Sequence, residues 1–87
     1  MIALRSKLND MGISWEDVSI IAEECPSCNI YRTRFVYNKH IISVISGTGT
    51  KGGIFGLLEL TIDTGEPTGD LTASGTIEIV TKTCTAA

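Results

Sequence analysis

The chain has 87 residues, 43% hydrophobic and 20% charged, which is the size and composition of one globular domain rather than of a disordered segment. Its net charge is −3, from seven Lys and Arg against ten Asp and Glu, whereas proteins that bind nucleic acid through phosphates normally carry a basic surplus. The uncharged stretch at 41–50 is too short and too polar to cross a bilayer, and no apolar secretory signal follows the N-terminus. We therefore expect a cytoplasmic protein, with nucleic acid disfavoured as a partner and no membrane association.

The N-terminal residues predict a helix. Leu4, Leu8 and Met11 recur at positions i, i+4 and i+7, which places them on one face of a helix, while polar residues point elsewhere. Gly12 suits the position just past the helix end, because glycine readily adopts a left-handed backbone conformation.

The segment from 13 to 28 is ambiguous. Ser14 followed three residues later by Asp17 hints at the start of a helix. The β-branched residues at 18–22 instead favour a short strand, which is the interpretation that we adopt. Trp15, the only tryptophan, is expected to pack in the core rather than to anchor an interface.

The middle of the chain carries the strongest β signal. Asn38 and Lys39 fit a two-residue turn between strands at 30–37 and 40–46, which together predict an antiparallel hairpin. The first strand alternates between two faces. One face carries Tyr31, Thr33, Phe35 and Tyr37, and the other carries Ile30, Arg32, Arg34 and Val36.

The last third of the chain predicts one more strand and a terminal element. Residues 56–63 favour a third strand, and the Gly- and Pro-containing cluster at 65–69 predicts a turn. Thr72 could cap a final helix, although Gly75 and several β-branched residues lower the helix propensity of 72–82, so helix and strand both stay open there.

These elements define an α+β fold in a single domain spanning 1–83, with a short tail at 84–87. We expect an N-terminal helix, a three- or four-stranded antiparallel sheet with a central hairpin, and a C-terminal helix on the same face of the sheet.

Several short strings in the middle of the chain resemble a group of small open reading frames from gut Firmicutes, their phages and their mobile elements. The resemblance covers about two thirds of the chain and implies a bacterial or phage context, with no activity attached. It rests on Trp15-Glu16-Asp17, Arg32-Thr33-x-Phe35, Ile42-Ser43-Val44-Ile45, Gly49-Thr50-x-Gly52-Gly53, Gly56-Leu57-Leu58-Glu59 and Gly65-Glu66-Pro67.

Cys25 and Cys28 form a CxxC motif, which can supply two of the four ligands of a zinc site. The remaining ligands would have to be Cys84 and His40, because no second CxxC or paired histidine exists. A redox or disulfide role is a further alternative, although the motif leads into a strand rather than a helix. We favour two thiols on a loop and a solvated histidine, and therefore expect no cofactor, with zinc as the alternative.

Gly47, Gly49 and Gly52 formally match a dinucleotide-binding fingerprint. That fingerprint needs a parallel βαβ unit and a following helix, whereas the hairpin indicates an antiparallel sheet. We therefore interpret the segment around Lys51 as a Gly-rich connection whose main-chain N–H groups could meet a partner.

Arg32 and Arg34 lie at i and i+2 on one strand face, where they could bind an anionic ligand or a protein partner. A solvent-facing sheet surface is the alternative. The candidate partner-binding residues are Arg32, Arg34, Gly49, Lys51 and Gly52.

No complete catalytic constellation appears in the sequence, so we expect a non-enzymatic interaction or accessory protein that binds a protein through its sheet face and Gly-rich loop. A metal- or thiol-dependent element centred on Cys25 and Cys28 is the alternative. The order helix, strands, helix also resembles that of double-stranded RNA-binding domains, but those use a basic second helix and loop, which residues 70–83 do not supply.

Overall fold

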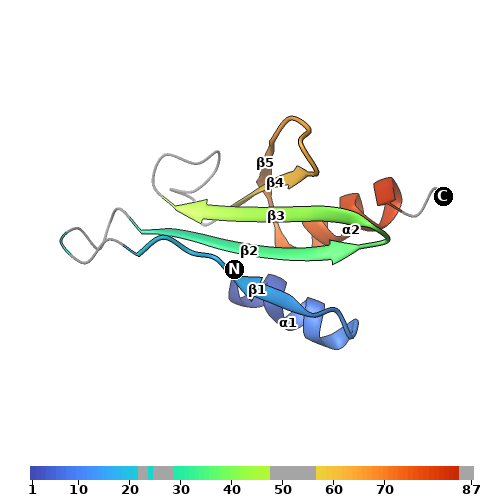
Figure 1. Cartoon of the computed structure of the whole chain (residues 1–87), viewed down its shortest axis with the longest axis horizontal. Helices are drawn as coiled ribbons and strands as arrows, with labels where there is room; N and C mark the ends of the chain where they lie inside the picture. Colours follow the sequence, from blue (N-terminus) through green and yellow to red (C-terminus); the bar gives the residue numbers. More distant parts are fainter. Residues whose placement is uncertain (22–23, 25–28, 48–56, 85–87) are drawn as a thin grey trace.

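The computed structural model describes residues 1–21, 24, 29–47 and 57–84. Its strands form one antiparallel sheet in which spatial order follows chain order, β1-β2-β3-β4-β5, with a long β2–β3 hairpin at the centre (Figure 1). The predicted α+β fold with a helix at each end is confirmed, and the described residues form five strands rather than three or four. The elements are α1 (Ile2–Asp10), β1 (Trp15–Asp17), β2 (Ile30–Tyr37), β3 (His40–Gly47), β4 (Leu58–Ile62), β5 (Thr68–Leu71) and α2 (Ala73–Cys84).

The end of α1 is a Schellman motif centred on Gly12. Gly12 has φ 72° and donates its N–H to Asn9 O (3.0 Å), while Ile13 donates to Leu8 O (2.9 Å). The predicted role of Gly12 is therefore confirmed. Met11, which we expected on the apolar face of the helix, instead caps the helix and is 42% exposed, because the motif turns the chain away from the helix axis.

The central hairpin has the predicted two-residue turn. Asn38 (φ 48°) and Lys39 (φ 70°) both adopt positive φ, as a type I′ turn requires, and Tyr37 lies opposite His40. The alternation in β2 is also confirmed: Thr33 and Phe35 are buried, whereas the residues between them face the other side of the sheet.

The strand expected at 18–22 is wrong, because the edge strand β1 covers Trp15–Asp17 and only Ile20 rejoins β2 as an isolated bridge. Ser19 explains the interruption. Its hydroxyl accepts from Arg32 N (2.9 Å) and donates to Asp17 Oδ1 (2.5 Å), so side-chain atoms replace the main-chain ladder there. These hydrogen bonds to Ser19 are the main reason that the pKa of Asp17 lies below its usual value.

The turn expected at 65–69 is partly strand, because β5 begins at Thr68 and forms the other edge of the sheet. Pro67 immediately precedes it, where a missing N–H does not interrupt the ladder. A bulge between the pairs Leu58–Leu71 and Leu60–Thr68 accommodates the left-handed backbone of Asp70 (φ 58°).

The C-terminal helix is confirmed. Thr72 caps it as predicted, since its Oγ1 accepts the N–H of Gly75 (3.0 Å), and the helix runs as far as Cys84. Within the described ranges, no helix has the length and apolar character needed to cross a membrane.

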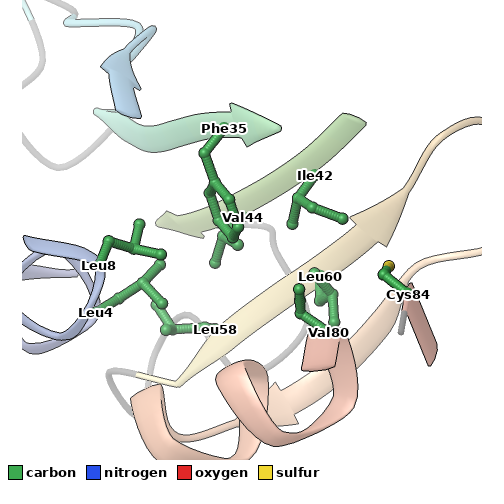
Figure 2. Close-up of a cluster of buried hydrophobic side chains, with 9 residues drawn as sticks. All are labelled: Leu4, Leu8, Phe35, Ile42, Val44, Leu58, Leu60, Val80 and Cys84. Carbon is green, nitrogen blue, oxygen red and sulfur yellow. The ribbon is translucent and has the colours of Figure 1, made fainter. Parts of the chain in front are cut away.

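Both helices cover the same face of the sheet. Leu4 and Leu8 of α1 and Val80 and Cys84 of α2 meet the inward side chains of β2, β3 and β4 (Figure 2). Each buried Leu, Val, Ile or Phe side chain of this layer contributes about 1.5–3 kcal/mol to the stability of the fold. The sheet residues in this core are Phe35, Ile42, Val44, Leu58 and Leu60.

Candidate functional site on the open face of the sheet

The face of the sheet turned away from the helices is called the open face. Because side chains alternate along each strand, it carries the residues that lie between the core positions. The register brings the open-face residues of neighbouring strands together in rows. The open face comprises Glu16 of β1, Ile30, Arg32, Arg34 and Val36 of β2, Ile41, Ser43 and Ile45 of β3, and Glu59 and Thr61 of β4.

An apolar pair stands on this face next to the hairpin turn. Val36 and Ile41 lie directly opposite each other in the β2–β3 register, and the two residues are 61% and 53% exposed. Single exposed apolar residues are common on soluble proteins, but adjacent ones that border a groove are typical of binding surfaces.

A groove of about 740 Å³ opens beside this pair. It lies where the chain leaves the Schellman motif and joins the sheet, and its volume falls within the range of ligand and side-chain binding sites. Its lining residues are Gly12, Ile13, Ser14, Trp15, Glu16, Arg34, Phe35, Val36 and Ile41.

The groove exists because β1 is shorter than β2. The pairing of the two strands begins at Trp15 opposite Phe35, so Val36 continues β2 without a β1 residue in register. Arg32 O accepts from Val18 N (3.0 Å), which shows that even-numbered residues of β2 direct their main-chain groups towards β1. The main-chain groups of Val36 therefore point to the side of β2 where the groove lies.

Trp15 forms a fixed wall of this groove. Its Nε1 donates to Asn9 Oδ1 (3.0 Å), and the Arg5 guanidinium lies 4.6 Å from the ring centroid, in cation–π range. Arg5 is itself held by Thr33 Oγ1 (2.8 Å) and Asp17 (3.2 Å). The prediction that Trp15 packs against the core is confirmed, and the same ring also borders the candidate site.

The charged residues of the open face are unequally paired. Arg34 meets Glu16 at 3.1 Å, and both side chains are more than half exposed. Among the described residues no acidic group pairs with the Arg32 side chain, and Arg32 Nε is buried without a hydrogen-bond partner. The two arginines thus share the face that their spacing predicted, while Gly49, Lys51 and Gly52 lie outside the described residues.

A second polar cluster lies at the hairpin-turn end of the molecule, near the end of α2 (Figure 1). Asp63 Oδ2 lies 2.7 Å from His40 Nδ1, and Asp63 Oδ1 accepts the N–H of Ile41 (2.8 Å). The hydrogen bond to His40 is the main reason that the pKa of Asp63 is lowered. The His40 side chain is 38% exposed and lies against this carboxylate at the surface.

Cys84 lies at the same end, where the side-chain amide of Asn38 donates to its carbonyl oxygen. Its side chain is fully buried, and this burial, followed by the charge of Asp63, raises the pKa of the thiol. The thiol consequently stays protonated and weakly nucleophilic at neutral pH.

In the part of the chain that is described, no three His, Cys, Asp or Glu side chains gather as metal ligands, and His40 and Cys84 are not joined by a further ligand. Cys25 and Cys28 lie outside the described residues, so the zinc site remains a prediction.

The groove and the His40–Asp63 pair were both missed from the sequence. Each joins segments that are distant in the chain and that carry no shared motif. The only local signals were Gly12, which marks the redirected chain, and the alternation that exposes Val36.

A scan of protein-family models and searches of curated proteins and of solved structures find no match to this chain.

Proposed function

We propose that the chain is a small non-enzymatic accessory protein that binds a protein partner through the open face of its sheet. The observation that carries the proposal is the groove bordered by the exposed pair Val36 and Ile41. Its proposed setting is the bacterial cytoplasm, in a cell that carries a phage or mobile element.

The composition of this surface supports a protein as the ligand. Aromatic residues and arginine are enriched in protein interfaces, and here Trp15 and Arg34 line one groove. The groove opens beside the strand surface of β2 and β3, so a partner can fill it with one side chain while covering the neighbouring residues. Such a central anchor surrounded by a polar rim is the usual anatomy of a small interface.

Site-specific photocrosslinking in expressing cells tests the proposal. A photoreactive phenylalanine analogue at position 41 should yield one discrete adduct with a second protein, because Ile41 stands at the groove. The same analogue at position 2 is the matched control, since Ile2 is 87% exposed on α1, away from the open face. The adduct should disappear when Val36→Thr, which keeps a β-branched side chain, is added.

Adducts that form equally from positions 2 and 41, or that survive Val36→Thr, would show that the open face does not select a partner. The absence of any adduct from position 41 in cells that express the chain would also contradict the proposal.

A further inference from the structure

Resting on the proposed function, we propose that the open face recognises an acidic partner segment: an apolar side chain enters the groove, and carboxylates beside it bind Arg34 and Arg32. The partner is thus defined by an apolar anchor and by negative charge placed on one side of it.

The spacing of β2 sets the spacing of these partner groups. Val36, Arg34 and Arg32 occupy alternate positions on one strand and share its open face, so consecutive members lie about 7 Å apart. Side chains at i and i+2 of an extended segment, or one turn apart on a helix, repeat at a similar distance. An apolar residue followed at that interval by two carboxylates would therefore match the groove and both arginines in order.

The charges of the open face favour an acidic segment. Within the described ranges no acidic group pairs with the Arg32 side chain, whose buried Nε has no hydrogen-bond partner, so a partner carboxylate would supply the acceptor that Arg32 lacks. Arg34 is paired with Glu16, but that pair is exposed and of the kind that contributes little in water. Glu59, the other acidic residue of the face, is only 9% exposed and has an interaction of its own.

Two other occupants are less suited to these residues. Nucleic acid has no apolar side chain that could enter the groove beside Val36 and Ile41. A second copy of the chain would offer Glu16 and Glu59 of its own open face, and both of these carboxylates already have partners. An acidic protein segment differs from both because its apolar anchor uses the groove, which phosphate groups do not fill.

Selection of random peptides displayed on phage against the immobilised full chain tests the inference. The enriched peptides should carry a large apolar residue with Asp or Glu on one side of it. A synthetic peptide of the enriched sequence can then be titrated against the chain in solution, where Trp15, the only tryptophan and a wall of the groove, reports binding through its fluorescence.

Matched variants separate the parts of the site. Arg32→Ala and Arg34→Ala should each weaken binding about three- to fivefold, and added salt should weaken the wild-type complex but have less effect on the double variant. Lys82→Ala removes a positive charge from α2 and should leave the affinity unchanged. The pair Val36→Thr and Ile41→Thr should weaken binding about tenfold, with circular dichroism confirming that each variant is folded.

The outcomes distinguish this inference from the proposed function. Selected peptides that depend on Val36 but show no acidic preference, or that ignore both arginines, would overturn the acidic partner and leave protein binding in place. Peptides displaced by single-stranded DNA, or a chain that sediments as a dimer through Val36 and Ile41, would overturn it in favour of those occupants. Failure to enrich any peptide that depends on Val36 would overturn both.

Discussion

Replacement of Gly12 by alanine should destabilise the protein through backbone conformation alone. An added Cβ would have no atom within 4 Å, so no clash contributes to the cost, but the residue must keep φ near 72°. Placing a non-glycine residue in that region costs about 1–2 kcal/mol. Alanine also restricts the unfolded chain more than glycine does, which stabilises the folded protein by about 0.4–1 kcal/mol. The midpoints of these two ranges leave a net loss of about 0.8 kcal/mol, or roughly 4 °C in Tm for a domain of this size.

Urea unfolding followed by circular dichroism measures this difference directly, with an unchanged slope showing that only stability has altered. Gly12→Asn is the companion variant and should recover part of the loss, because asparagine tolerates left-handed backbone better than alanine does. Ser74→Ala is the contrasting control, since Ser74 is an exposed residue in the first turn of α2, where alanine favours the helix. A Gly12→Ala protein as stable as the wild type would show that the Schellman geometry does not hold the end of α1.

Three further variants probe the core, the polar cluster and the buried thiol. Leu8→Ala should cost about 2–5 kcal/mol in urea unfolding, because it leaves a cavity under the sheet; a loss below 1 kcal/mol would contradict the packing. Asp63→Asn should destabilise the chain at neutral pH. Because the pKa of Asp63 is lower in the folded state, the stability that Asp63 contributes is present above the unfolded pKa and is lost as the pH falls through the folded pKa. The free energies of unfolding of the two proteins should therefore converge at acidic pH. In a Cys25→Ser, Cys28→Ser background, Cys84 should react with a thiol reagent only as fast as the protein opens, and rapid labelling of the native state would refute its burial.

The hairpin and both helices were accessible from the sequence because their signals are local. Alternation in β2 reports which side chains face the core, and a two-residue spacing fixes the register of β3 on it. Thr72 and Gly12 mark helix ends through hydrogen bonds and backbone conformations confined to a few residues. Such features depend little on contacts with residues that are distant in the sequence.

The two edge strands could not be predicted from the sequence, because contacts with distant residues override the local secondary-structure preference there. The β-branched residues at 18–22 favour a strand, yet Ser19 diverts the ladder by bonding to the main chain of Arg32. Pro67 and Gly69 are typical of a turn, yet β4 recruits the residues around them as an edge strand. In both cases the strand boundaries depend on contacts with residues that are distant in the sequence, which a local pattern does not predict.

The candidate site arises at the opposite end of β1 from Ser19, where the strand begins. The Schellman motif turns the chain at Gly12, and β1 then pairs with β2 only from Trp15 onwards, so Val36 is left uncovered at the groove. A longer β1 would have paired with Val36 and filled that space with its own side chains. The short strand is held by the contacts of Arg5 with Trp15 and Asp17, which fix one wall of the groove in the free protein. Because this wall is already ordered in the free protein, binding of a partner loses less conformational entropy.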